Sequence, residues 1–357
     1  MIRYSVCGAA SYVCGELLRL MIQHPQAQLA HLLAKNSAGR KIQEEHPALA
    51  GFYDQEILLM DDANLDMAIA DSDVLFVAVD AGAVCPIAEK VLAAGKKLID
   101  FGADIRFRDA RIWEQWYKHP HPNHKMSQEA VYCIPELHRD LARGKSLIAN
   151  PGCYPTATTL ALYPVLKEGM VVDNTIIVDA KSGYTGAGRR PDPYKLLTEA
   201  TENFCAYSMG GGHRHTPEIE QNIAGITGKD LMQPDQWQYI NFQPHLIPQS
   251  RGIEATVYAT LNCETSSQEL YELYQRYYQN EFFIHVYPAS KPVQTKWTAG
   301  TNLCCMTPTF DQRTKRLIVS SVIDNIGKGA AGQAIQNMNL IFGLDETTGL
   351  KLAPVCP

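Results

Sequence analysis

The residues best suited to covalent chemistry lie in the stretch Asn150-Pro151-Gly152-Cys153-Tyr154-Pro155-Thr156. A short apolar run over 146–149 precedes it and predicts a strand, and the residues that follow predict a helix. Cys153 is therefore expected at a strand-to-helix turn, where the positive end of a helix dipole favours the thiolate over the thiol. A thiolate is the form of cysteine that attacks a carbonyl carbon. The alternative is a small residue packed inertly under a tight turn, because free cysteines are commonly buried.

A second candidate group lies in the stretch His213-Arg214-His215-Thr216-Pro217-Glu218. The pattern predicts a helix with Thr216 as its N-cap and Pro217 as its first residue. His215 would then stand at the mouth of that helix, where an imidazole can act as a general acid or base. Glu218 either orients His215 or is only a favourable acid in the first helical turn, and both interpretations remain open.

Anion-binding groups are expected in the glycine-rich loop 182–190, which ends in Arg189 and Arg190. A guanidinium can grip a phosphate or carboxylate with two parallel hydrogen bonds. A plain surface loop with solvated arginines fits the same residues. The histidines at 119, 121 and 124 alternate with prolines and lack a nearby Cys or acid, so we predict a surface loop there and no metal site.

The first 150 residues show the pattern of a nucleotide-binding domain. Over these residues, apolar strands alternate with helices, the first of which is expected to begin at Gly15, and this alternation predicts a doubly wound parallel sheet. The segment from Arg106 to Lys145 is expected to be irregular. The turn 8–15 after the first strand is where a dinucleotide pyrophosphate would meet a helix N-terminus. Gly8 and Gly15 flank this turn, but Ala10 and Ser11 occupy its centre, so a nucleotide loop and an ordinary tight turn both remain open.

The loop 33–41 bears on which dinucleotide would bind. It lacks the acid that usually holds the ribose hydroxyl of NAD. It carries Ser37, Arg40 and further cations instead, which would accept the 2′-phosphate of NADP. A solvated basic loop is the alternative.

The second half of the chain predicts a different architecture. Alternating apolar and polar residues predict strands over 239–246, 252–261, 282–287 and 317–324. Few helices intervene, which indicates a mixed or antiparallel sheet and an α+β domain. Helices are expected over 267–280 and 329–342, the second rich in small residues.

Composition excludes several classes of partner. The chain has 357 residues, enough for two domains, and a net charge of −6 that gives no basic footprint for nucleic acid. No apolar run reaches the roughly 18–20 residues that a membrane span needs. Ten scattered cysteines without a CxxC pair fit a reducing interior. We expect a cytoplasmic protein without nucleic-acid or membrane partners.

Together these motifs resemble the N-acetyl-γ-glutamyl-phosphate reductases, relatives of aspartate-semialdehyde dehydrogenase. The likeness rests on the cysteine and histidine stretches above, on 179–189, on 248–258 with Arg251-Gly252, and on the segment from Val322. It implies an α/β fold: a Rossmann-type NADP-binding domain over 1–150, to which a helix over 326–357 returns, and an α+β catalytic and dimerisation domain over 151–325.

The resemblance also implies a reaction in arginine biosynthesis, the reduction of N-acetyl-L-glutamyl 5-phosphate by NADPH to N-acetyl-L-glutamate 5-semialdehyde and phosphate. Cys153 would form a thioester and His215 would be the acid/base. The implied partners are a small acyl phosphate and further copies of the chain, in a homodimer or homotetramer. The implied substrate-binding residues are Arg106, Arg189 and Arg251, and the cofactor-binding residues are Gly8, Ser11, Ser37, Arg40, Gly183 and Asn325.

One departure from the family pattern concerns the first turn, which is usually of the Gly-Ala-Ser-Gly-Tyr-Thr-Gly type. Here Ser11 and Cys14 stand where glycines would be. This altered turn leaves open a catalytically silent homologue that serves as a binding subunit. Separately, the residues that would read the N-acyl group are not identifiable, so a reductase of another acyl phosphate, such as an aspartyl or acylated aminoadipyl phosphate, also remains open.

Overall fold

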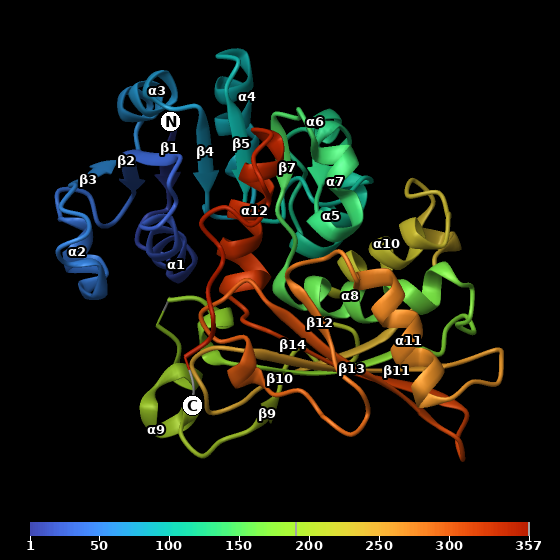
Figure 1. Cartoon of the computed structure of the whole chain (residues 1–357). Coiled ribbons are helices and arrows are strands. Elements are labelled where there is room, and N and C mark those ends of the chain that lie inside the picture. Colours follow the sequence, from blue (N-terminus) through green and yellow to red (C-terminus); the bar gives the residue numbers. More distant parts are fainter. Residues whose placement is uncertain (190, 356–357) are drawn as a thin grey trace. The chain divides into compact units, whose positions relative to one another are not determined.

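The computed structural model describes residues 1–189 and 191–355, which form two compact units (Figure 1). Unit 1 comprises residues 1–151 and 330–351, and unit 2 comprises 152–329 with the described residues from 352 onward. Arg190 and the last two residues of the predicted returning segment 326–357 lie outside the described residues. The predicted domain roles of 1–150 and 151–325 remain predictions.

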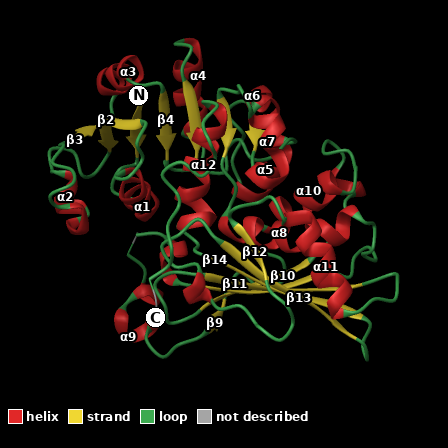
Figure 2. Ribbon diagram, in the orientation of Figure 1, coloured by secondary structure: helices red, strands yellow, loops and turns green. Residues whose placement is uncertain are grey.

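Unit 1 is built on a seven-stranded sheet in which all neighbouring strands run parallel, in the order β3-β2-β1-β4-β5-β7-β6 (Figure 2). This confirms the predicted doubly wound sheet, since β1 to β5 follow the Rossmann order. The strands are β1 (Ile2–Cys7), β2 (Ala27–Ala34), β3 (Ile57–Leu59), β4 (Val74–Val77), β5 (Lys97–Asp100), β6 (Val131–Tyr132) and β7 (Leu147–Ala149).

The helices of unit 1 correct two expectations. The first helix begins at Tyr12 rather than at Gly15, because Ser11 accepts a hydrogen bond from the amide of Cys14 and caps it. The segment from Arg106 to Lys145, expected to be irregular, contains three helices. The helices are α1 (Tyr12–Met21), α2 (Ile42–Glu45), α3 (Asp62–Asp71), α4 (Val84–Ala93), α5 (Ala110–Tyr117), α6 (His124–Glu129), α7 (Pro135–Ala142) and α12 (Gly332–Ile341).

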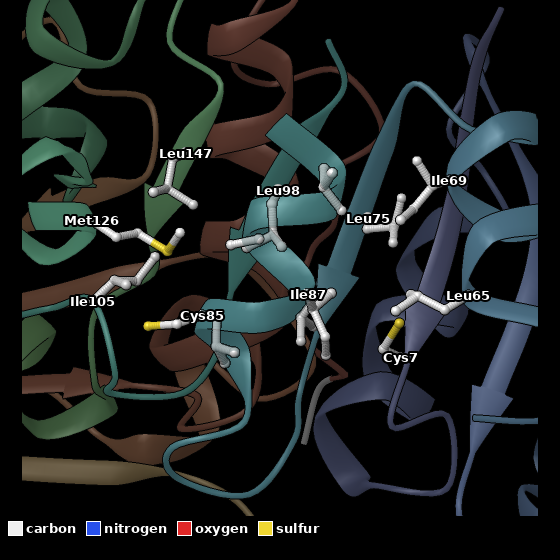
Figure 3. Packing of buried hydrophobic residues seen from close by; sticks show 14 of the residues in the cluster. Cys7, Leu65, Ile69, Leu75, Cys85, Ile87, Leu98, Ile105, Met126 and Leu147 are labelled. Carbon is white, nitrogen blue, oxygen red and sulfur yellow. The ribbon is translucent and has the colours of Figure 1, made fainter. Parts of the chain in front are cut away.

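A continuous apolar layer holds this unit together. The β4 strand Val74-Leu75-Phe76-Val77 is wholly buried, as expected of a parallel strand covered on both faces. Leu75 packs in one cluster with Leu65 and Ile69 of α3 and with Ile87 of α4 (Figure 3). The core therefore fixes the carboxyl ends of β1, β4 and β5, where ligands bind in such sheets.

Unit 2 is built on a mixed sheet, which agrees with the predicted mixed or antiparallel sheet. Its strands lie in the order β12-β13-β14-β11-β8-β10-β9. β11 pairs antiparallel with β14 and β8, whereas β8 and β10 are parallel. The interior strand β13 was missed because its apolar run contains a proline and two adjacent cysteines. The strands are β8 (Ile177–Ser182), β9 (Cys205–Ala206), β10 (Asn241–Leu246), β11 (Ile253–Thr260), β12 (Ile284–Val286), β13 (Cys304–Asp311) and β14 (Arg316–Ile323).

Helices cover one face of this mixed sheet. The helix α8 (Cys153–Lys167) contacts β11 and β14, and α10 (Thr216–Ile226) and α11 (Ser267–Tyr278) pack beside it. Tyr274 and Tyr278 of α11 donate hydrogen bonds of 2.6 Å to carbonyl oxygens of α8. Only the short helix α9 (Leu197–Ala200) and 3-10 or π turns complete the helical content of the described part of unit 2. Among the described residues, no helix is both long and apolar enough to cross a membrane.

Candidate active site

Cys153 is the first residue of α8, directly after the N-cap Gly152, and its side chain is half-buried. The residue that packs against it is Gly329, in a π-helical turn over Gly327–Ala331. A Cβ atom on Gly329 would lie 2.7 Å from the Cβ of Cys153, closer than real Cβ contacts occur. Gly329 was recognised from sequence only as a small helical residue, and the structure shows that the space is taken by the cysteine.

The helix that carries Cys153 is tied to the helix that carries His215. The backbone N–H of Gly152 donates a hydrogen bond of 2.8 Å to Oε1 of Glu218, a buried carboxylate in the first turn of α10. His215 itself is the N-cap of α10, one position earlier than predicted, so Thr216 is the first helical residue. The two predicted catalytic residues therefore stand at helix N-termini joined by one carboxylate.

Aromatic side chains linked by hydrogen bonds lie next to His215. The Nδ1 atom of His213 accepts the backbone N–H of His215 at 3.0 Å. Its Nε2 atom lies 3.4 Å from the hydroxyl of Tyr207, which donates to the hydroxyl of Tyr154 at 3.2 Å. The ring of Tyr154 also packs edge-on against both histidines. Burial, followed by the neighbouring His215, lowers the pKa of His213 to about 3, so His213 is neutral at working pH. With Nδ1 accepting, the proton of this neutral ring lies on Nε2, toward Tyr207.

Tyr207 was not identified from sequence, since a tyrosine in an irregular segment carries no distinctive signal. Burial raises the pKa of both Tyr207 and Tyr154 above the ordinary value, so both hydroxyls keep their protons. The hydroxyl of Tyr207 donates to Tyr154 and that of Tyr154 to the carbonyl of His245 at 3.5 Å, and neither can serve as a base.

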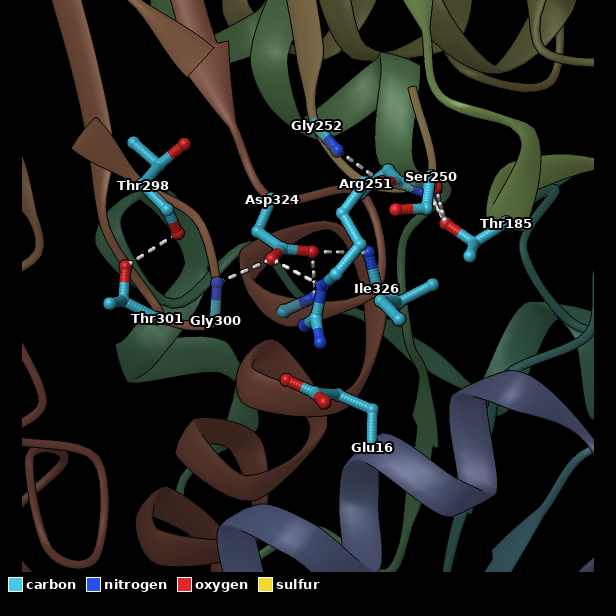
Figure 4. Close-up of polar contacts among 12 residues, drawn as sticks. Glu16, Thr185, Ser250, Arg251, Gly252, Thr298, Gly300, Thr301, Asp324 and Ile326 are labelled. Atoms are coloured by element: carbon cyan, nitrogen blue, oxygen red, sulfur yellow. Dashed lines mark hydrogen bonds and ion pairs between the residues drawn. The ribbon is translucent and has the colours of Figure 1, made fainter. Parts of the chain in front are cut away.

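Arg251 is held by a fully buried acid (Figure 4). Its Nε atom donates to Oδ2 of Asp324 at 2.9 Å, and the same oxygen accepts the N–H of Gly300 at 2.6 Å. The other oxygen of Asp324 accepts the N–H groups of Ile326 and Gly327, each at 3.0 Å. The carboxylate thus fixes the guanidinium in place, while the side chain of Arg251 remains 27% exposed.

Asn325 and Gly183 connect two loops in unit 2. The Oδ1 atom of Asn325 accepts the N–H of Gly252 at 2.7 Å, and its Nδ2 donates to Thr185 at 2.9 Å. At Gly183 a Cβ would come within 2.7 Å of the backbone of Ser250, so glycine is required where the loops pass. The predicted cofactor contacts of Asn325 and Gly183 remain predictions.

The other two predicted anion-binding arginines occupy different settings. Arg189 is exposed, just after the 3-10 turn Tyr184–Ala187. Arg106 is buried at the carboxyl edge of the parallel sheet in unit 1. Its Nε donates to the carbonyl of Asn150 at 2.9 Å and its Nη2 to that of Phe101 at 2.8 Å.

A cavity of about 240 Å³ lies beside the first turn of unit 1. Gly8 lines it in a left-handed conformation with φ of +90°, and a Cβ there would lie 2.1 Å from the carbonyl oxygen of Ala78. Any side chain at position 8 would therefore push β1 and β4 apart. Other lining residues come from the ends of β1, β2 and β4 and include Ala10, Lys35, Ser37 and Asp80.

The departure at Ser11 and Cys14 has a local explanation. The hydroxyl of Ser11 accepts the N–H of Cys14 at 3.2 Å, so a side-chain cap stands where the family pattern has glycine. Cys14 points into the core and is fully buried, and burial raises the pKa of its thiol to about 12. Gly15 is needed because the ring of His46 occupies the space that its Cβ would take, at 2.6 Å. The turn therefore closes by capping, and the cavity beside it persists.

The predicted 2′-phosphate loop divides into two parts. Ser37 is buried at the cavity, and Lys35 is exposed at the same cavity. Arg40 instead forms ion pairs with Glu45 and, at 3.6 Å, with Glu44. Lys35 is therefore a more suitable cation for the cavity than Arg40.

No cluster of histidine, cysteine and acidic residues able to hold a metal ion occurs in the described part of the chain. The nine cysteines that the structure describes are free thiols. The histidine-rich loop is less exposed than expected: His121 is buried against the carbonyl of Asp104, and His124 contacts Glu114.

Comparison with known proteins matches the chain to two family models and to full-length relatives. Family models describe residues 3–144 as a semialdehyde dehydrogenase NAD binding domain and 153–325 as a semialdehyde dehydrogenase dimerisation domain. The chain is 44% identical to an N-acetyl-gamma-glutamyl-phosphate reductase of Desulforudis audaxviator and 41% identical to one of Moorella thermoacetica, over 100% of each chain. It is 45% identical to the enzyme of that name in Symbiobacterium thermophilum, over 100% of this chain and 99% of the relative.

Solved structures share the fold at low identity. Aspartate semialdehyde dehydrogenase II of Vibrio cholerae superposes with a TM-score of 0.68 at 16% identity, over 95% of this chain and 98% of that one. The aspartate semialdehyde dehydrogenase of Candida albicans, solved with NADP, gives 0.67 at 15% identity with the same coverage. At these identities the likeness establishes the architecture alone.

Proposed function

The chain belongs to the N-acetyl-gamma-glutamyl-phosphate reductases of the semialdehyde dehydrogenase family, and from this membership we propose that it reduces its acyl phosphate through a thioester on Cys153. Its activity is that of an oxidoreductase in arginine biosynthesis. The observation that carries the mechanism is the hydrogen bond from Gly152 to Glu218, because it joins the helix starts that bear Cys153 and His215.

The chemistry assigns each group a step. The thiolate of Cys153 attacks the acyl carbon of N-acetyl-L-glutamyl 5-phosphate. The bond between that carbon and the phosphate oxygen breaks, phosphate departs, and a thioester on Cys153 remains. NADPH, when bound, supplies the hydride that reduces this thioester. His215 takes the thiol proton in the first half-reaction and returns a proton to the thiohemiacetal oxygen. Collapse of the thiohemiacetal, with loss of that proton, releases the semialdehyde and regenerates the thiolate.

Helix geometry supports the choice of nucleophile. Cys153 stands at the positive end of α8, which is fifteen residues long, and a helix N-terminus favours the thiolate. Tyr154 and Tyr207 lie near the cysteine and keep their protons, so they add no negative charge that would oppose the thiolate.

The cofactor assignment rests on unit 1. The chain contains a nicotinamide dinucleotide-binding domain of its family, and the cavity at Gly8, Lys35 and Ser37 fits the adenosine end of a dinucleotide. We propose NADP rather than NAD because Ser37 and Lys35 offer a hydroxyl and a cation where NAD sites carry an acid. Arg40 would contribute only by leaving its partners Glu44 and Glu45.

The anionic ends of the substrate need cationic partners. Arg251 is suited to this role, because Asp324 has already fixed its guanidinium and little entropy is lost on binding. Arg106 carries a second fixed charge at the carboxyl edge of the parallel sheet. Arg189 offers a third on an exposed loop. We propose that Arg251 and Arg106 bind the two anionic groups and that Arg189 acts in substrate entry.

Self-association is expected through residues 153–325, the dimerisation domain of the family. We propose a homodimer or a homotetramer built on the sheet face opposite α8. That face is half-buried and carries opposite charges: Lys181 lies 3.0 Å from Asp179 and 3.7 Å from Glu254. Phe204, 56% exposed, stacks on His245 beside it. A symmetric partner would meet matched charges on this face.

The test is a steady-state assay of the reaction between NADPH and N-acetylglutamyl phosphate. The same reaction can be followed in the reverse direction, as phosphate-dependent reduction of NADP by the semialdehyde. Cys153→Ser is expected to abolish turnover, with Cys263→Ser, an exposed thiol, as the matched control. Full activity in Cys153→Ser would refute the thioester mechanism. A higher kcat/KM with aspartyl phosphate would assign another substrate, and no NADPH binding in a titration would indicate a silent homologue.

A further inference from the structure

Two carboxyl groups in unit 1 are fully buried and take no part in the chemistry above. Asp100 ends β5 and Asp104 lies in the loop that follows, and both side chains are 0% exposed. Oδ1 of Asp100 accepts the N–H of Gly102 at 2.7 Å, and Oδ2 of Asp104 accepts those of Gly82 and Val84 at 2.8 and 3.2 Å. The second oxygen of each meets no donor among the described residues. Two such orphaned oxygens in one place require an explanation.

A single proton on Asp100 supplies that explanation. Asp104 accepts two N–H groups at the positive end of α4, so negative charge is well stabilised there. Asp100 has one N–H donor. Burial, followed by the charge on Asp104, raises the pKa of Asp100 to about 7, against the opposing effects of Gly102 and Arg106. Two buried like charges that act on each other repel, and one proton on the pair removes the repulsion.

The other ionisable groups around Asp100 and Asp104 determine the net charge of this buried region. Cys85 of α4 faces both carboxyls, and burial followed by those carboxyls raises the pKa of its thiol to about 12, so it is neutral. His121 contacts the backbone carbonyl of Asp104 through its Nε2. Glu89 of α4 acts on Cys85 and is exposed. With Asp100 protonated, the buried groups are one anion, Asp104, and one cation, Arg106.

Arg106 is the group that this arrangement affects. Its two hydrogen bonds to Phe101 and Asn150 hold the guanidinium between the ends of β5 and β7. Phe101 follows Asp100 directly, and the N–H of Asn150 donates to the carbonyl of Asp100 at 2.9 Å. The backbone that holds Arg106 is thus the backbone that carries Asp100.

We propose that Asp100 and Asp104 hold one proton between them and thereby position Arg106 to bind the anionic group of the substrate. Asp100 is a positioning residue, because it acts through Arg106 and its backbone contacts. The functional half of this inference rests on the proposed role of Arg106 in anion binding. Ionisation of Asp100 would add a negative charge beside the guanidinium, which weakens anion binding while leaving the covalent steps at Cys153 unchanged.

The experiment has an arm that needs no substrate. In full-length protein labelled with ¹³C at aspartate carboxyl carbons, one resonance is expected to titrate near pH 7 and to be absent from Asp100→Asn. Asp104→Asn is expected to lower the midpoint of that resonance, because the repelling charge is gone. If Asp100→Asn does not fold, the shared proton is tested by the other two proteins: a resonance that titrates near pH 7 in wild type and at a lower pH in Asp104→Asn would support it.

The second arm is the KM for N-acetylglutamyl phosphate from pH 6 to 9 in wild type and Asp100→Asn. The ratio of the two KM values is expected near one at pH 6, and the wild-type KM should be at least roughly threefold higher above pH 8, with kcat unchanged. Comparison at equal pH cancels the titration of the substrate. Asp109→Asn is the control, since that carboxylate, the N-cap of α5, is paired with Arg111.

The titration tests the shared proton, and the KM ratio tests its effect on Arg106. If every aspartate titrates below about pH 5.5, the shared proton is refuted. If the resonance titrates near 7 but the KM ratio stays flat, the pair exists and its effect on Arg106 is refuted. Complete inactivity of the wild type would contradict the proposed function and would leave the titration result standing.

Discussion

Replacement of Gly329 by alanine tests whether the catalytic cysteine is positioned by the turn packed against it. The new Cβ would lie 2.7 Å from Cys153 Cβ, 3.2 Å from its Cα and 3.3 Å from the carbonyl oxygen of Asp324. Gly329 does not have a positive φ, so the substitution introduces no backbone strain of that kind. The effect on packing must come from these contacts, of which the one with the cysteine Cβ is the shortest.

The size of the effect follows from the overlap. An ordinary contact begins at 3.4 Å, so the two Cβ atoms must separate by 3.4 − 2.7 = 0.7 Å. Overpacking of this kind costs about 1–3 kcal/mol of stability, against a gain of ~0.5–1 kcal/mol for replacing a helical glycine. Misplacement of a reacting group by about 1 Å can cost ~10²-fold in rate. We expect kcat to fall between roughly 10- and 100-fold, with a net loss of stability of ~1 kcal/mol.

Gly225→Ala is the matched control. Gly225 is an exposed glycine in α10, and its added Cβ would meet only Leu231 Cδ2, at 3.8 Å. This variant should gain ~0.5–1 kcal/mol of stability and keep the wild-type kcat. The assays are steady-state kinetics, urea unfolding and the rate of alkylation of Cys153. Wild-type kcat and alkylation rate in Gly329→Ala would show that the cysteine tolerates displacement and would refute its positioning by Gly329.

Three further predictions concern single groups. Asp324→Asn should raise the KM for the acyl phosphate and lower the free energy of unfolding by ~3 kcal/mol in a urea titration, because Arg251 loses its buried partner; an unchanged KM would contradict the role of Arg251. Gly8→Ala should weaken NADPH binding at least ~10-fold in a fluorescence titration, because its Cβ meets the carbonyl of Ala78; equal affinity would move the cofactor elsewhere. Asp100 has a folded pKa of about 7 against an ordinary 3.8, so its stabilising protonation is fully present below the unfolded value and is lost as pH rises through 7. Wild type should therefore lose on the order of 4 kcal/mol relative to Asp100→Asn between pH 4 and 8 in urea unfolding.

The fold class was predictable because its signals are local. Apolar strands alternating with helices predicted the parallel sheet, and the period-two strands of the second half predicted the mixed sheet. The failures occurred where local signals conflict with tertiary context. β13 contains Pro308, which demotes a run to an edge strand by sequence rules, although it lies between β12 and β14. The segment with α5 to α7 was read as irregular because prolines and histidines interrupt its periodicity.

The candidate site was predictable for the groups that do chemistry and not for the groups that hold them. Cys153 and His215 stand at helix starts, which short sequence motifs reveal. Their supports are distant in sequence: Glu218 binds the amide of Gly152, and Gly329 packs against Cys153. No propensity or spacing rule connects residues so far apart. The cap formed by Ser11 was also missed from sequence, where this residue was considered only for its cofactor contact, which remains a prediction.

The supporting groups in each unit share one physical property, which explains how the candidate functional residues are positioned. Each is either a buried carboxylate that accepts backbone N–H groups or a glycine whose missing Cβ makes room for a neighbour. Asp324 and Asp104 each accept backbone amides from a turn, and Glu218 does so at a helix start. A buried carboxylate with several donors resists displacement, because every amide it releases would be left unsatisfied. Substitutions at these positions should therefore alter turnover or substrate affinity without removing any group that touches the substrate.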